Sequence, residues 1–242
     1  MLGKNEIKDI QSLSQKKHRD ELKLFIAEGP KIVGELVELI PHQVKKIYAV
    51  GEWIETYRSL VQTIDVIEVS DVELSRLSQQ QTPNQVIAVI RKNSAKKPDA
   101  SSFTLYLDTI QDPGNFGTIV RIADWFGIKD MVCSAGCVDL YNPKVVQSTM
   151  ASIARVNVFY NEKDEWLKDQ TVPVFAATLD GSSLYEHSKT ENGILIVGNE
   201  SKGIRPEILQ FANEKLTIPK KGNAESLNAA VATGIILSHL LK

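Results

Sequence analysis

Hydrophobic residues along the first third of the chain alternate between helix-like and strand-like spacing. In residues 30–40 they recur every three or four positions, as on one helix face, at Ile32, Val33, Leu36, Val37 and Ile40. The runs 44–51, 64–70 and 85–92 are rich in β-branched residues, which predicts strands. Ser70 and Glu73 have the spacing of a helix capping box. This alternation predicts a small α/β/α domain over residues 1–92.

A polar segment without periodicity, residues 93–101, predicts a linker. After it come apolar runs, each followed by Gly or polar residues and then by a helical segment, at 103–108, 130–136, 172–178, 193–199 and 215–219. Near-continuous apolar strands separated by helices predict a parallel sheet covered on both faces, in a second domain over residues 102–242. Ligands of such sheets bind beyond the carboxyl ends of the strands. The loops at those ends are therefore the candidates for chemistry.

The composition excludes several classes of protein. The 242 residues are 43% hydrophobic and 24% charged, with a net charge of −2, which argues against a strongly basic nucleic-acid binder. No apolar run is long enough for a membrane span, and the charged N-terminal stretch lacks an apolar signal core, so we expect a cytoplasmic protein. The two cysteines are too few for a disulfide framework. The four histidines show no ligand spacing, and we expect no metal site.

Three loops at predicted strand ends carry polar residues. In the first, residues 107–128, Asn115 begins a helix with Arg121 on its second turn; the second, 194–204, contains Glu200 between two glycines. The third, 218–228, leads through Ser226 into the last helix. Each loop also has an ordinary interpretation: Asn115 and Ser226 as helix N-caps, Arg121 in a surface ion pair, Glu200 in a surface turn.

Together and in this order, the three loops resemble the three motifs of the SpoU (TrmH-type) branch of the SPOUT RNA 2′-O-ribose methyltransferases. The motifs read DPGNFGTIVRIADWFG, LIVGNESKGI and IPKKGNAESLNAAVATGIIL, and the resemblance covers residues 104–241. Residues 12–38 resemble, more loosely, the added RNA-binding domain of the family, which has a ribosomal-protein-like fold, through Lys17, Arg19, Phe25, Glu28 and Gly29. At residues 82–90 the family usually has a Gly where this chain has Asn84 and Gln85.

The resemblance implies a parallel α/β SPOUT domain with a deep C-terminal trefoil knot, S-adenosylmethionine as cofactor, no metal, and a homodimer whose site is completed across the interface. Arg121 matches the catalytic arginine of the family, and the pocket around it is matched by Asn115, Glu200, Ser226 and Asn228. The residues that match cofactor-binding positions are Thr178, Leu179, Gly198, Asn199, Ile218 and Leu227. RNA contacts are expected from Lys16, Lys17 and Arg19.

The predicted function is S-adenosylmethionine-dependent methylation of a ribose 2′-OH in structured RNA. The added N-terminal domain favours 23S (large-subunit) rRNA, because such a domain suits recognition of a folded RNA hairpin. The alternatives are a tRNA 2′-O-methyltransferase and a non-catalytic RNA-binding or ribosome-assembly protein with the same fold. A nucleotide-dependent enzyme acting on small molecules is disfavoured, since the dinucleotide fingerprint G-x-G-x-x-G is absent from the first loop.

Overall fold

The computed structural model describes residues 2–241, which divide into two compact units. The first unit contains Met1–Ser94 and Asp139–Ala154, and the second contains Ala95–Val138 and Arg155–Lys242. The sequence predicted a single boundary at the linker 93–101. It did not predict that the segment 139–154, which follows a strand of the second unit, packs with the first.

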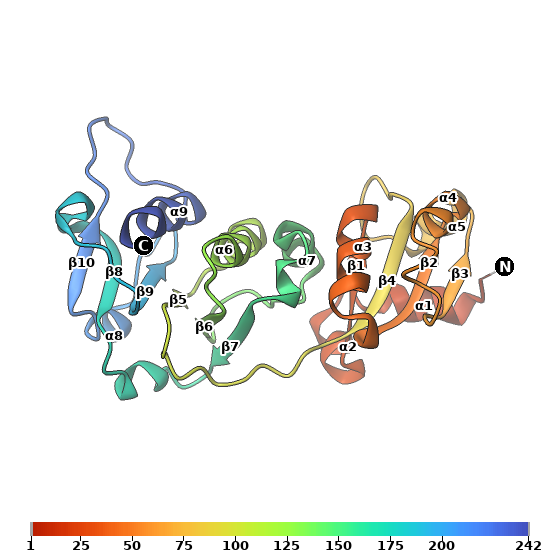
Figure 1. Ribbon diagram of the computed structural model, residues 1–242, viewed down its shortest axis with the longest axis horizontal. Coiled ribbons are helices and arrows are strands. Elements are labelled where there is room, and N and C mark those ends of the chain that lie inside the picture. Colours follow the sequence, from red (N-terminus) through yellow and green to blue (C-terminus); the bar gives the residue numbers. More distant parts are fainter. Residues whose placement is uncertain (1, 242) are drawn as a thin grey trace. The chain divides into compact units, whose positions relative to one another are not determined.

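The first unit has a four-stranded sheet in the order β1-β4-β2-β3 (Figure 1). Strand β4 (Val86–Arg91) lies antiparallel to both β1 (Leu24–Glu28) and β2 (Val44–Ala49), and β2 pairs in parallel with β3 (Val66–Glu68). Strand β1 was not predicted. All five of its residues are buried, as in a strand covered on both faces.

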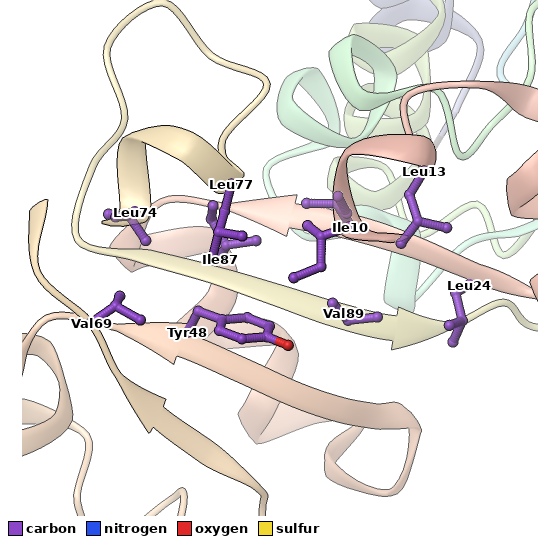
Figure 2. Packing of buried hydrophobic residues seen from close by; sticks show 10 residues of the cluster. Ile10, Leu13, Leu24, Tyr48, Val69, Leu74, Leu77, Ile87 and Val89 are labelled. Atoms are coloured by element: carbon purple, nitrogen blue, oxygen red, sulfur yellow. The ribbon is translucent and has the colours of Figure 1, made fainter. Parts of the chain in front are cut away.

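Helices cover this sheet: α1 (Lys4–Ser12), α2 (Lys16–Leu22), α3 (Pro30–Leu39), α4 (Gly51–Thr56), α5 (Asp71–Leu77), α7 (Pro143–Thr149) and the 3₁₀ turns η1 (Pro41–Gln43) and η2 (Ser152–Ala154). The predicted capping box of α5 is confirmed, since Glu73 N donates to Ser70 Oγ (3.3 Å) and Ser70 N donates to Glu73 Oε2 (3.1 Å). Figure 2 shows how Leu74 and Leu77 of α5 meet Ile87 of β4 in the core.

The second unit is built on a six-stranded sheet in the order β10-β8-β9-β5-β6-β7, in which every pair of neighbours is parallel. The predicted parallel sheet is thereby confirmed. The strands are β5 (Thr104–Asp108), β6 (Asp130–Ser134), β7 (Asn157–Asn161), β8 (Val174–Ser183), β9 (Ile194–Gly198) and β10 (Glu214–Thr217). Only β7 was not predicted, and it is an edge strand with three half-buried positions.

Both faces of this sheet are covered. Helix α9 (Ala229–Leu240) packs against α6 (Pro113–Trp125) and against β8 and β9. A second apolar cluster joins alternate strand residues such as Tyr106 and Ile196 to Trp166 of η3 (Trp166–Asp169) and Ile208 of α8 (Pro206–Leu209). In Figure 1, α8 and α9 lie on opposite sides of the strands β8 and β9. Long loops lead from β9 to α8 and from β10 to α9, and these loops carry the predicted chemistry.

The C-terminal end of α9 lies against the segment that connects β8 to β9. Thr190 N donates to Leu240 O (2.7 Å), and a ring nitrogen of His239 lies 3.1 Å from His187 O, just after η4 (Leu184–Glu186). This proximity of the last helix to an earlier connection agrees with a knotted arrangement, while the trefoil knot itself stays a prediction. Within residues 2–241 no helix has both the length and the apolar character that a membrane span requires.

Candidate active site

A cavity of about 670 Å³ lies in the second unit, beside residues 177–180 of β8 and beyond the carboxyl ends of β9 and β10. Its volume falls within the range of small-molecule sites, roughly 300–1,000 Å³. The residues that line it include all of the predicted cofactor-binding positions, namely Thr178, Leu179, Gly198, Asn199, Ile218 and Leu227. Glu200 and Ser226 line it as well. The structure therefore brings the second and third sequence motifs to one cavity.

The loop after β9 is held in a fixed shape. Asn199 and Gly203 exchange two backbone hydrogen bonds of 3.0 and 2.8 Å. A Cβ atom on Gly198 would lie 2.4 Å from the carbonyl carbon of Gly203, so only glycine allows this close approach. The side chain of Asn199 donates to Thr109 O (2.9 Å) and accepts from Ser201 N (2.9 Å). Glu200 is thus presented from a rigid loop at the mouth of the cavity.

A chain of hydrogen bonds joins the three motifs. Asn115 Nδ2 donates to Glu200 Oε1 (2.6 Å), and Asn228 Nδ2 donates to Asn115 Oδ1 (2.7 Å). The amide of Asn115 therefore uses its oxygen and its nitrogen at once, which fixes its orientation. These contacts link residues that are 85 and 113 positions apart in the sequence.

The helix caps differ from the sequence-based expectation. Helix α6 is capped by Asp112, whose Oδ1 accepts from Asn115 N (2.7 Å), so Asn115 is not an N-cap. Helix α9 is capped by Asn228, which accepts from Ala230 N (3.0 Å) and Val231 N (3.2 Å). The expectation that Ser226 caps this helix is wrong, because α9 begins at Ala229 and Ser226 lies in the exposed loop before it.

Arg121 is not among the residues that line the cavity. It is exposed on α6, and within residues 2–241 its guanidinium makes neither a hydrogen bond nor an ion pair, so the ordinary surface ion pair is not observed. Trp125 follows one turn later on the same exposed face and is 85% exposed. An unpaired arginine beside an uncovered tryptophan is typical of a surface that another molecule covers.

A cluster of charged side chains that the sequence did not predict lies next to the site and fixes the loop after β9. Asp108, at the carboxyl end of β5, is fully buried and accepts from Arg205 N and from Arg205 Nε at 2.8 Å each. Arg205 Nη2 also bonds Asp164 Oδ2 (2.9 Å). Burial disfavours the charged guanidinium, but the hydrogen bonds to both carboxylates outweigh it and raise the pKa of Arg205. Arg205 ends the loop that carries Glu200, so this cluster fixes the loop to the sheet.

The cavity has the donors and surfaces that a nucleoside-containing cofactor requires. Leu179 and Leu227 expose 76% and 46% of their surface, although both are apolar. Thr178 also lines the cavity, and its hydroxyl lies near the carboxylate of Asp180. Uncovered leucines can contact the face of a base, and the hydroxyl can bond a polar group. The residues present therefore fit S-adenosylmethionine.

The predicted RNA-binding residues of the first unit have different environments. Lys16 and Lys17 are exposed at the start of α2. Arg19 is 2% exposed, forms an ion pair with Asp139 (2.6 Å) and donates to Leu13 O (2.9 Å). The guanidinium of Arg19 is buried and its charge is paired with Asp139, so Arg19 is not available to contact RNA.

Comparison with known protein families shows which family this chain belongs to. Residues 102–238 match the model of the SpoU rRNA Methylase family, and residues 4–88 match the MRM3-like substrate binding domain. The chain belongs to the SpoU rRNA methylase family. The predicted family is thereby confirmed, and so is the predicted enzyme class, an RNA 2′-O-methyltransferase that uses S-adenosylmethionine.

Relatives of this SpoU methylase differ in how much of the chain they match. The 23S rRNA (guanosine(2553)-2′-O)-methyltransferase RlmP of Bacillus subtilis is 33% identical over 98% of this chain and 97% of its own length. The structure of an AdoMet-bound rRNA methyltransferase from Sinorhizobium meliloti covers 99% of this chain and 95% of its own, with a TM-score of 0.86 and 30% identity. A tRNA (guanosine(18)-2′-O)-methyltransferase of Aquifex aeolicus is 32% identical over 55% of this chain and 65% of its own length.

Proposed function

We propose that this SpoU methylase transfers the methyl group of S-adenosylmethionine to a ribose 2′-OH of large-subunit rRNA. The observation that carries the proposal is that the second and third motifs line one cavity, and that the Glu200–Asn115–Asn228 hydrogen bonds join the first motif to them. The choice of rRNA is supported by the extent of the similarity. The 23S rRNA enzyme of Bacillus subtilis matches 98% of this chain, whereas the tRNA enzyme of Aquifex aeolicus matches 55%.

The cofactor would be held by the residues that line the cavity. When bound, S-adenosylmethionine supplies a methyl group on a positively charged sulfur. Leu179 and Leu227 cover apolar parts of the ligand, and the hydroxyl of Thr178 bonds a polar part. The loop from Gly198 to Gly203 is held by its own backbone hydrogen bonds, so little ordering is required when the cofactor binds.

Arg121 is proposed to orient a phosphate of the RNA and to stabilise the negative charge that develops on the 2′ oxygen. A guanidinium stays protonated, which suits charge stabilisation better than removal of a proton. Its planar fork also suits bidentate contact with a phosphate. A neutral 2′-OH is a weak nucleophile and must lose its proton to solvent as its oxygen takes up the methyl group, so stabilisation of the developing negative charge contributes directly to the rate. Asn115 and Asn228 position Glu200 at the cavity, and Ser226 lies on the loop that lines it.

A homodimer explains why Arg121 does not line the cavity of its own chain. We propose that the exposed face of α6, with Arg121 and Trp125, packs on a second copy and delivers Arg121 to the cavity of that copy. The free guanidinium and the uncovered indole support this arrangement. In the first unit, Lys16 and Lys17 supply charge for RNA, and dimerisation doubles that charge.

The substrate is tested by mapping 2′-O-methylated nucleotides in rRNA and tRNA from cells that have or lack the protein. We expect one site in large-subunit rRNA to lose its methyl group when the protein is absent. A methyl group lost only from tRNA would contradict the choice of substrate. No lost methyl group in either RNA, together with no binding of S-adenosylmethionine in calorimetry, would favour the non-catalytic alternative.

The role of Arg121 is tested by mixing two inactive variants. Arg121→Ala should abolish methylation while the cofactor still binds, and Glu200→Ala should also lower methylation strongly. If Arg121 acts on the partner's cavity, a mixed dimer contains one intact site and one doubly altered site, so activity returns on mixing. If Arg121 acts within its own chain, every site keeps one lesion, and the mixture stays inactive.

A further inference from the structure

Two glutamine side chains of the first unit form a pair that the proposed chemistry does not use. We call Gln80 and Gln147 the amide cluster. Gln80 Nε2 donates to Gln147 Oε1 (2.9 Å), which joins the loop after α5 to helix α7. Both side chains are partly exposed, so a ligand can reach them.

A buried carboxylate fixes the loop that carries the cluster. Glu28 is 6% exposed and accepts hydrogen bonds from Gln79 N (3.0 Å) and from Ser78 Oγ. Gln80 N in turn donates to Ser78 Oγ (3.0 Å). Burying a carboxylate costs free energy unless its oxygens accept hydrogen bonds. The oxygens of Glu28 accept them from the loop after α5 and so hold the main chain of that loop. The glutamine side chains are consequently presented from an ordered backbone.

Helix α7 presents the other half of the surface. Val145, Val146 and Thr149 are buried, while Lys144 is exposed and Gln147 is partly exposed one turn later. Met150 ends the helix in the left-handed conformation, with φ of 47°, and is 37% exposed. A cation, amides and a flexible apolar side chain therefore lie along one helix face and its end.

We propose that the amide cluster reads an unpaired base of the RNA substrate and that Lys144 contacts the adjacent phosphate. This inference rests on the proposed function. Amides pair with base edges because they donate and accept at once, whereas a phosphate offers only acceptors. Beyond the Gln80–Gln147 bond, no described residue uses the remaining N–H groups of Gln147 or the side-chain oxygen of Gln80. Single-stranded RNA loops expose such edges, and methionine offers an apolar contact to the base face.

The test is binding of rRNA fragments to the full-length protein, measured by fluorescence anisotropy. The altered proteins are Gln80→Ala, Gln147→Ala and the double variant; the matched control is Gln81→Ala, which removes an exposed glutamine from the same run. We expect each variant in the cluster to weaken RNA binding about tenfold, while the control and the affinity for S-adenosylmethionine stay as in the wild type. Equal RNA affinity of the wild type and the double variant would overturn the inference.

Two further measurements separate base reading from a structural role. RNA with single abasic sites should identify one position where loss of the base weakens wild-type binding but does not affect the double variant. A structural role would instead leave the double variant as sensitive as the wild type. Lys144→Ala should lower the salt dependence of binding by about one phosphate contact, whereas the glutamine variants should leave it unchanged. If the fragments bind in this manner but are never methylated, the proposed function is wrong and the inference stands.

Discussion

The ion pair between Arg205 and Asp108 yields the most direct prediction from the structure. Asp108 is fully buried, and the side chain that neutralises it belongs to a residue 97 positions later, at the end of the loop that carries Glu200. In Arg205→Ala the carboxylate would keep one donor, the backbone N–H of residue 205, which now lies at 2.8 Å. The variant would therefore leave a buried charge without a counter-ion, and it would also free the loop.

The expected loss of stability follows from the degree of burial. Removing one member of a buried ion pair costs about 3–5 kcal/mol, because the other charge is left unpaired. The side chain of Arg205 is 36% exposed, and the backbone donor remains, so we expect the lower end, about 3 kcal/mol. Because the loop also positions Glu200 and Asn199 at the cavity, affinity for S-adenosylmethionine should fall roughly tenfold, which corresponds to about 1.4 kcal/mol.

Urea denaturation measures the loss of stability in the second unit. Trp166 is buried there, and a Trp53→Phe background removes the buried tryptophan of the first unit from the signal. Adding Asp108→Asn to Arg205→Ala removes the unpaired charge and should recover about 1–2 kcal/mol. Lys215→Ala is the matched control, since it breaks an exposed ion pair with Asp180 and should cost less than about 1 kcal/mol. If Arg205→Ala is no less stable than this control, the assignment of Arg205 as the anchor of the loop is refuted.

Three further predictions concern the turn at residue 85, the buried carboxyl group and the dimer surface. Gln85 has φ of 58°, in the left-handed region that favours glycine, so Gln85→Gly should raise the free energy of unfolding by up to about 1 kcal/mol and Gln85→Val should lower it; equal melting curves would contradict this. Burial raises the pKa of Glu28 from 4.5, so its contribution to stability is present below that pH and is lost as the pH rises through the raised pKa. The difference in free energy of unfolding between the wild type and Glu28→Gln should therefore fall as the pH is raised from acid to neutral. A difference that does not change with pH would contradict this prediction. Trp125→Glu should give a monomer without methylation in sedimentation and activity assays, whereas Val72→Glu, at a position 63% exposed in the first unit, should leave the assembly unchanged.

The sequence determined those features that depend on short segments. Apolar runs of strand length after residue 102 predicted the parallel sheet, because a strand buried on both faces requires such a run. The three motifs identified the family, and the resemblance to it supplied eight of the residues that line the cavity. The Ser70–Glu73 capping box was predicted for the same reason, since both of its hydrogen bonds form within one helical turn.

Tertiary structure decided which atoms each polar residue meets. Arg19 has the sequence context of an RNA contact. In the structure, however, its side chain is buried and forms an ion pair with Asp139, 120 positions later. Asn228, and not Ser226, caps the last helix and at the same time holds Asn115. A local pattern constrains only neighbours within a turn or two, whereas these bonds depend on where distant strands end, and that position is fixed only when the whole sheet has packed.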